Sequence, residues 1–196
     1  MSITQGHSST PRLTIEMIPS SMWYHNVRQA VTQNSWDKLR KMTYAKAGQV
    51  CEVCSGVGKQ HPVECHEIWY FDDYQKIQTL LGLTALCPDC HAVKHIGLSN
   101  VQGRLQPCLE HLANTNLWTI KQAAEYANEC ADLCQSRSRF NWLVDITWLD
   151  QHQVKYTHKY LNCLSDLEPG GPKRNFVQRL QQTFSFNPHK PIKTQE

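Results

Sequence analysis

No stretch of this 196-residue chain is apolar for long enough to cross a membrane. Residues 1–11 contain no basic segment followed by an apolar run, so we expect no signal peptide and a cytoplasmic protein. The excess of positive over negative charge is small as well. The formal net charge of +3 permits nucleic-acid binding through a local patch but does not demand it. In a reducing compartment, cysteines indicate metal binding more often than disulfides.

What the chain does contain is cysteine and aromatic residues in quantity. Nine cysteines and six tryptophans accompany a hydrophobic content of 40%. That composition is typical of a globular protein rather than a disordered one, and 196 residues suffice for one hydrophobic core with a small satellite. We found no internal repeat and no long low-complexity tract, which excludes repeat architectures.

Four of the cysteines form two Cys-x2-Cys pairs, Cys51 with Cys54 and Cys87 with Cys90. Each pair can form a tight knuckle that supplies two thiolates to a metal. Four thiolates close a tetrahedral shell around Zn²⁺ and leave no open position. The spacing therefore predicts a structural zinc site.

Two histidines follow the last of these cysteines at helical spacing. His91 and His95 stand at i and i+4, which places both imidazoles on one face of a helix. The pattern indicates a second metal site. We assign no role to His111, His152 or His158, and we expect Cys65, Cys108, Cys130, Cys134 and Cys163 to pack as small apolar residues.

Residues 48–97 resemble the HNH endonucleases that carry a four-cysteine zinc site. The resemblance rests on the two cysteine pairs, on His66-Glu67-Ile68, and on the run from Leu86 to His95. It implies a ββα-metal fold, in which a strand, a loop, a second strand and a helix surround one divalent ion. Residues 12–40 and 104–149 are similar to the flanks of small bacterial HNH nuclease-like proteins. The expected fold class is α+β, with a zinc-stapled ββα-metal module embedded in a small helix-and-strand domain.

The resemblance also implies roles for individual residues. Aligned on Ile68, it makes His66 a metal ligand and places Glu67 where the family has its base histidine. His91 and His95 fall on the remaining ligand positions of the family. The expected catalytic set is therefore His66, Glu67, His91 and His95, with the three histidines holding a divalent ion.

Two alternatives to this register remain open. Cys65 can be the ligand and His66 the base, although a thiolate suits Mg²⁺ poorly. Glu67 can instead orient a ligand histidine through its side-chain N–H, because neighbouring residues of a regular strand point to opposite faces. Gly82 stands where the family usually has its middle asparagine.

Phosphodiester hydrolysis needs a divalent ion with an incomplete protein shell, a general base and a nearby cation. Three imidazoles leave such a shell open, and they favour Mn²⁺, Ni²⁺ or Zn²⁺ over Mg²⁺. Lys94 is the cation closest in sequence to the histidine pair, and we expect it to contact a phosphate. The basic residues of 34–47 are either a solvated surface or a phosphate-contacting rim.

The elements that we expect inside the module are strands at 63–70 and 83–86, a short helix at 75–81, and a helix at 91–96 ended by Gly97. Outside it we expect helices at 34–47, 106–114, 119–135 and 175–184, and strands at 12–17 and 140–148 that pair in a sheet. The corresponding segments are a disordered N-terminus at 1–11, a strand and helix at 12–47, the module at 48–97, a helical and β-strand flank at 98–165, and a C-terminal helix and tail at 166–196.

Two classes of function agree with this sequence. The first is an HNH endonuclease that hydrolyses phosphodiester bonds in DNA. The second is a catalytically silent HNH fold that binds nucleic acid or docks on a larger effector complex, for which Glu67 and Gly82 argue. No membrane partner is expected in either case.

Overall fold

The computed structural model describes residues 10–23, 25–157 and 160–162. These residues form a mixed α+β fold. Its strands are β1 (Glu64–Asp72), β2 (Ile77–Leu86), β3 (Leu143–Asp145) and β4 (Tyr160–Asn162). Its α-helices are α1 (Val27–Ala30), α2 (Gln33–Lys46), α3 (Pro88–Lys94), α4 (Ile96–Val101), α5 (Leu105–Asn116) and α6 (Ile120–Arg137). Two 3₁₀ helices, η1 (Ser20–Met22) and η2 (Thr147–His152), complete the set.

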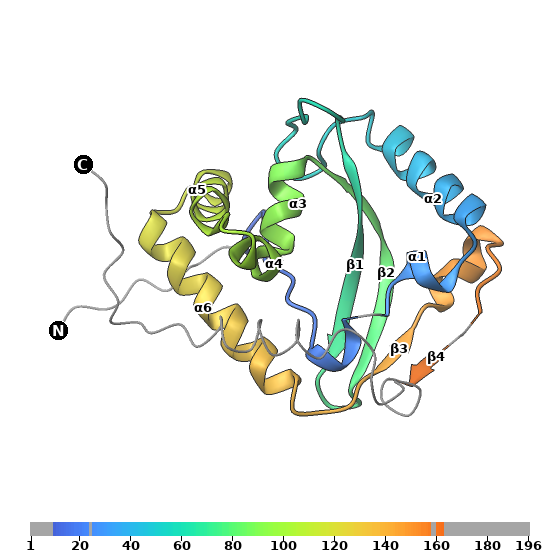
Figure 1. The fold of residues 1–196 in the computed structure, drawn as a ribbon. Helices are drawn as coiled ribbons and strands as arrows, with labels where there is room; N and C mark the ends of the chain where they lie inside the picture. Colours follow the sequence, from blue (N-terminus) through green and yellow to red (C-terminus); the bar gives the residue numbers. More distant parts are fainter. Residues whose placement is uncertain (1–9, 24, 158–159, 163–196) are drawn as a thin grey trace.

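The antiparallel hairpin of β1 and β2 runs through the middle of the molecule (Figure 1). Helices α3 to α6 lie on one side of it, at the left of the view, and α2 lies on the other. The sheet has the order β1-β2-β3-β4, with β3 parallel to β2 and antiparallel to β4. The hairpin therefore separates two groups of helices.

Each side of the hairpin has its own hydrophobic core. One core joins α3, α5 and α6 with Leu13 and Ile15, and it includes Cys51, Cys87 and Cys90. The other joins α1, α2 and η2 with Trp69, Leu80 and Trp142. Burial of apolar surface on both sides fixes the hairpin in place.

The hairpin corrects one prediction of the sequence analysis. Of the segment 75–81, expected as a short helix, residues 75 and 76 belong to the turn after β1, and residues 77–81 belong to β2, which pairs with β1 from Asp72↔Ile77 onward. The apolar residues Ile77, Leu80 and Leu81 have helical spacing, but short apolar runs do not distinguish a helix from a strand. A register shift at Ile68/Trp69 leaves Leu81 without a partner on β1 and exposed.

The helix expected at 91–96 is α3, which begins and ends earlier than predicted. Cys87 is the N-cap of α3, where its sulfur accepts from the N–H of Cys90, and Pro88 occupies the first turn. The backbone leaves helical geometry at His95, with φ −101° and ψ 39°, and α4 starts at Ile96. Gly97 therefore lies inside α4 and does not end α3.

The predicted strand at 12–17 is not a strand. The N–H and the carbonyl of Leu13 bond the side chain of Asn116, at 2.9 and 2.8 Å, and the N–H of Glu16 donates to the carbonyl of Lys94 at 3.1 Å. These partners belong to α5 and α3, so the segment follows the helices. The predicted strand at 140–148 shrinks to β3, which pairs with β2 and β4, and the residues after it form η2.

The other helices of the flanks agree with the sequence. The predicted helix at 34–47 is α2, although its cap is Thr32 rather than Asn34 or Ser35. The helices at 106–114 and 119–135 are α5 and α6, and the capping box of Thr119 and Gln122 is present. The predicted helix at 175–184, Cys163 and His158 lie outside the described residues.

Candidate metal centre

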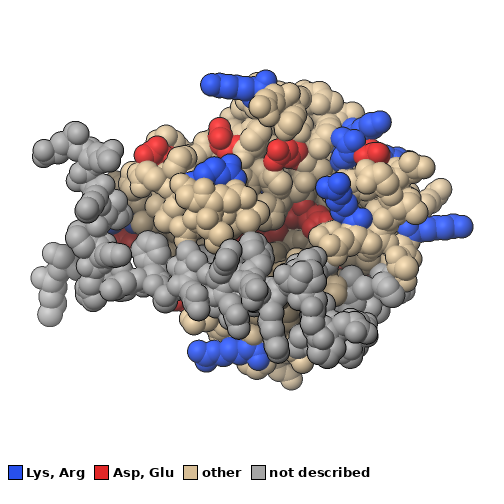
Figure 2. Space-filling model, in the orientation of Figure 1, with Lys and Arg blue, Asp and Glu red and all other residues tan. Residues whose placement is uncertain are grey.

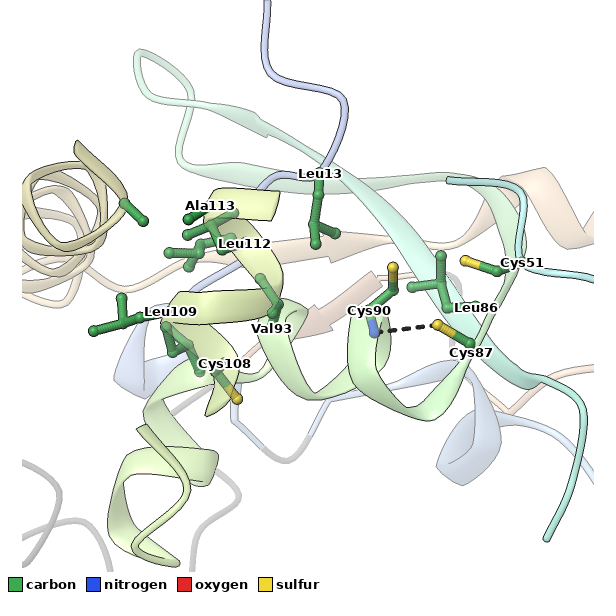
Figure 3. Close-up of a cluster of buried hydrophobic side chains, with 13 residues drawn as sticks. Leu13, Cys51, Leu86, Cys87, Cys90, Val93, Cys108, Leu109, Leu112 and Ala113 are labelled. Carbon is green, nitrogen blue, oxygen red and sulfur yellow. Dashed lines mark hydrogen bonds between the residues drawn. The ribbon is translucent and has the colours of Figure 1, made fainter. Parts of the chain in front are cut away.

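The four predicted zinc ligands come together at the start of α3. The sulfur atoms of Cys51, Cys54, Cys87 and Cys90 all lie within 4.8 Å of one another. Figure 3 shows Cys51, Cys87 and Cys90 around Leu86, at the edge of the core that α3 and α5 share. The four cysteines are arranged as in a zinc site.

Backbone N–H groups support the sulfur atoms in both knuckles. The N–H of Gly56 donates to the sulfur of Cys54 at 3.4 Å, and that of Cys90 donates to the sulfur of Cys87 at 3.5 Å. The first knuckle closes on itself, because the N–H of Cys51 donates to the carbonyl of Gly56 at 3.0 Å. Such donors stabilise thiolates, which are the form that binds zinc.

Hydrogen bonding and burial separate the pKa values of Cys51, Cys87 and Cys90. A hydrogen bond from Cys90 lowers the pKa of Cys51 to about 4, and the same bond raises the pKa of Cys90, which keeps the proton. Burial raises the pKa of Cys87 to about 11. Among these three thiols, that of Cys51 therefore ionises readily, and ionisation of Cys87 and Cys90 needs a cation to offset the charge. A divalent, thiophilic ion such as Zn²⁺ fits this donor set.

His111 is a contact that the sequence analysis missed. Its Nε2 lies 3.1 Å from the sulfur of Cys90, although the residue is 21 positions away on α5. An imidazole N–H at this distance can donate to a metal-bound thiolate and fix its orientation. No sequence signal separates His111 from other histidines, because only the packing of α3 against α5 brings it here.

The three predicted histidine ligands also converge. One ring nitrogen each of His66, His91 and His95 lies within 4.8 Å of the others, and the ring centroids are 4.8 to 5.3 Å apart. His66 comes from β1 and is 4% exposed, while His91 lies on α3 and His95 directly follows it. This group could hold a metal ion.

The surroundings keep these imidazoles available as ligands. Burial lowers the pKa of His91, and burial together with the neighbouring imidazoles lowers the pKa of His95 to about 3. His91 Nδ1 forms a short contact with a carboxylate oxygen of Glu64 on β1. That contact leaves Nε2 of His91 for a metal, in the arrangement in which a carboxylate orients a ligand histidine.

Glu67 lies apart from the histidine cluster. Its Oε1 accepts from the N–H of Val27 at 2.6 Å, at the first residue of α1. Adjacent residues of a regular strand point to opposite faces, and Glu67 is absent from the group of possible ligands that His66, His91 and His95 form. Glu67 thus occupies neither the position of a base beside the histidines nor that of an orienting partner for them. Burial raises its pKa to about 7.

Other predicted residues also have defined surroundings. Cys65 packs against the core of α2 rather than joining the histidines, and burial raises its pKa to about 12. The second register, with Cys65 as ligand, therefore does not match the geometry. A side chain at Gly82 would first meet the indole of Trp148, at 3.8 Å. The Nζ of Lys94 donates to the hydroxyl of Thr14 at 2.6 Å, and burial lowers the pKa of this amine.

In the part of the chain that the structure describes, no helix is both long and apolar enough to cross a membrane.

The candidate centre consists of a cysteine cluster and a histidine cluster joined by α3. No family model, no curated protein and no solved structure matches the chain, so a functional assignment has to come from these residues and their geometry.

Proposed function

We propose that this chain is a metal-dependent HNH-type endonuclease that hydrolyses phosphodiester bonds in DNA. Zinc would occupy the cysteine cluster, and a second divalent ion would be held by His66, His91 and His95. The observation that carries the proposal is the convergence of these three histidines from a strand and a helix, with their ligand atoms within 4.8 Å of one another. The free cysteines in the described residues fit a cytoplasmic setting.

The arrangement of elements supports the same proposal. An antiparallel hairpin, β1 and β2, is followed at once by α3, and the histidines lie between β1 and α3. This order is that of the ββα-metal fold, which the resemblance to HNH endonucleases implies. The four cysteines join the loop before β1 to the start of α3, so they would hold the helix against the strand that carries His66.

An ion bound at the histidines would polarise the scissile phosphate and stabilise the leaving 3′ oxygen. Neighbouring residues of the chain prepare the histidines to bind this ion. Glu64 fixes the ring of His91, and burial keeps His95 neutral, so that both can serve as ligands. Imidazole ligands suit Zn²⁺, Ni²⁺ and Mn²⁺ better than Mg²⁺.

The proposed substrate needs a basic surface, and α2 offers one. Its basic residues are Lys38, Arg40, Lys41 and Lys46. Figure 2 shows Lys and Arg side chains gathered at the right of the view, where Figure 1 places α2, with an acidic side chain among them. On α2 itself, Arg40 pairs with Asp37 at 2.6 Å. Contacts from such side chains to phosphates would add affinity without sequence preference.

Nicking of supercoiled plasmid tests the proposal. Zinc-loaded protein should cleave when Mn²⁺, Ni²⁺ or further Zn²⁺ is added, and His91→Ala should lower the rate at least about 100-fold, because the ion loses a ligand. His152→Gln is the matched control, since this residue lies on η2 against Trp148. Equal cleavage by wild type and His91→Ala would rule out hydrolysis at this site.

The second candidate is a catalytically silent module that binds nucleic acid or a larger effector complex. Its supporting observation is the engagement of Glu67 with α1, which leaves the base position of the family without a base. Metal analysis separates the two candidates. A single zinc per chain, lost only when cysteines are replaced, supports the silent module. A second ion that is lost in His91→Ala supports the enzyme.

A further inference from the structure

The extended segment before η1 brings a carboxylate to the histidine cluster. Two contacts with the last residue of α3 hold this segment. The N–H of Glu16 donates to the carbonyl of Lys94 at 3.1 Å, and Nζ of Lys94 donates to the hydroxyl of Thr14 at 2.6 Å. Lys94 directly precedes His95 in the chain. The segment is therefore fixed beside the cluster, although α1 and α2 separate it from β1 in the sequence.

The carboxylate of Glu16 pairs with the ring of His66. Oε1 of Glu16 lies 3.2 Å from Nε2 of His66, and the two side chains are 12% and 4% exposed. Both atoms are buried, and neither forms a hydrogen bond with any other described residue. Glu16 stays outside the group of possible ligands that His66, His91 and His95 form. Its contact with the cluster is therefore this pair.

The pair determines which nitrogen of His66 carries a proton. An ionised carboxylate only accepts hydrogen bonds, and so does a ring nitrogen without a proton. Two buried acceptors 3.2 Å apart would repel each other and stay unsatisfied, whereas a proton on Nε2 lets the two atoms pair. A neutral imidazole that is protonated on Nε2 keeps its lone pair on Nδ1. Nδ1 is then the nitrogen of His66 that can bind a metal.

His91 shows the same arrangement with the two nitrogens exchanged. Its Nδ1 contacts the carboxylate of Glu64, which leaves Nε2 for a metal. Glu64 lies on β1, two residues before His66, whereas Glu16 reaches the cluster from the segment before η1. A carboxylate partner of this kind fixes the tautomer and the ring orientation of a ligand histidine and strengthens its binding to the metal.

We propose that Glu16 is a positioning residue of the histidine site, which accepts the Nε2–H of His66 and so directs Nδ1 of this histidine to the ion. The inference rests on the second ion of the proposed function and adds to it a residue from outside residues 48–97. The site then binds a divalent ion through Nδ1 of His66 and Nε2 of His91, each held by its own carboxylate.

Nitrogen NMR identifies the ligand atom without reference to activity. Zinc-loaded full-length protein with ¹⁵N-labelled histidine receives a further equivalent of Zn²⁺. Long-range ¹H–¹⁵N spectra then distinguish metal-bound, protonated and free ring nitrogens. The signals of His66 are those that are absent from His66→Asn. We expect a metal-bound Nδ1 and a protonated Nε2 in His66, and the reverse in His91.

Competition with a chelator measures what Glu16 contributes to binding of the second Zn²⁺. Glu16→Leu keeps the volume of the side chain but not the acceptor, and we expect it to weaken binding at least about 10-fold. Glu16→Gln keeps an acceptor oxygen and should weaken binding less. Glu129→Gln, on the exposed surface of α6, is the matched control and should equal wild type. Retention of the first zinc and unchanged circular dichroism would show that the variants are folded.

These results separate the role of Glu16 from the proposed function. A His66 that binds through Nε2, wild-type affinity in Glu16→Leu, or equal losses in both Glu16 variants would overturn the positioning role and leave the histidine site standing. A wild type that takes up no second ion would overturn both this inference and the proposed function.

Discussion

At the scale of single residues, Glu67 shows how strand geometry overrides sequence proximity. It is adjacent to His66 in the chain, yet its carboxylate accepts the N–H of Val27 and so caps α1 from a different element. The N-cap Asn26 satisfies a second N–H of the same turn, that of Gln29, at 2.9 Å. A helix of four residues depends on such caps, which gives Glu67 a structural role.

The raised pKa of Glu67, about 7 against an ordinary 4.5, predicts a pH-dependent stability. Between these values the unfolded chain releases this proton while the folded chain keeps it, so stability falls as pH rises through this range. Glu67→Gln removes the titration and keeps an acceptor oxygen. We therefore expect the variant to gain stability relative to wild type from about pH 5 to about pH 8, measured by urea unfolding of zinc-loaded protein. Parallel pH profiles would contradict the assignment.

The contact of His111 with Cys90 predicts an effect on the zinc site. His111→Ala removes the imidazole that lies 3.1 Å from the sulfur, and we expect the affinity for zinc to fall about 10- to 100-fold. Competition with a chromophoric chelator measures this affinity. Glu110→Ala, at the exposed neighbouring position of α5, should match wild type. An unchanged affinity in His111→Ala would show that the contact does not support the cluster.

At the scale of elements, α3 connects the two clusters. Its first turn carries Cys87 as N-cap and Cys90, and its remaining length carries His91 and ends at His95. Val93 of the same helix is fully buried against α5 and the residues around Leu112. Packing of α3 against α5 therefore fixes the rotation of the helix, and with it the directions of both sets of ligands.

Removal of a side chain from this interface should destabilise the fold. Leu112 is fully buried, and Leu112→Ala leaves a cavity between α5 and α3. We expect a loss of about 2 to 5 kcal/mol in the free energy of unfolding, as measured by urea denaturation of zinc-loaded protein. Leu117→Ala is the control, because Leu117 is 90% exposed and its truncation should cost little. Similar losses in both variants would show that the interface is not the cause.

At the scale of the whole molecule, the cysteine cluster joins parts of the chain that the sequence keeps apart. It connects the loop after α2 to the start of α3, and it lies at the edge of the core that contains Leu13 and α5. The hairpin between these segments carries His66. A metal at the cysteines would therefore stabilise the loop, the hairpin and α3 together.

Removal of zinc should accordingly unfold this side of the molecule. We expect a strong chelator to lower the Tm and reduce the helical signal in circular dichroism, because four buried or half-buried thiols then lose their shared cation. Added Zn²⁺ should restore both signals, and Mg²⁺ should not, since it binds thiolates poorly. A chelated protein with an unchanged melting curve would mean that the cluster is not a structural site.

Local patterns in the sequence predicted much of the fold. The capping box at Thr119, the apolar faces of α2 and α5, and the spacing of the cysteine pairs all depend on neighbours within a few residues. Prediction from local patterns was wrong where the same pattern of apolar residues fits both a helix and a strand. The apolar residues of 77–81 suit a helix equally well, and only pairing with β1 makes them a strand.

His66 was expected from the resemblance to HNH endonucleases, whereas local spacing was sufficient to group the four cysteines and to pair His91 with His95, because knuckle spacing and the i, i+4 pair are properties of nearby residues. It was not sufficient for the groups that surround them. Glu16, Glu64 and His111 reach the clusters from other elements, and Glu67 leaves them because β1 turns its side chain toward α1. Contacts between distant segments depend on how helices and strands pack, and that packing follows from burial of the two cores as wholes rather than from any short pattern.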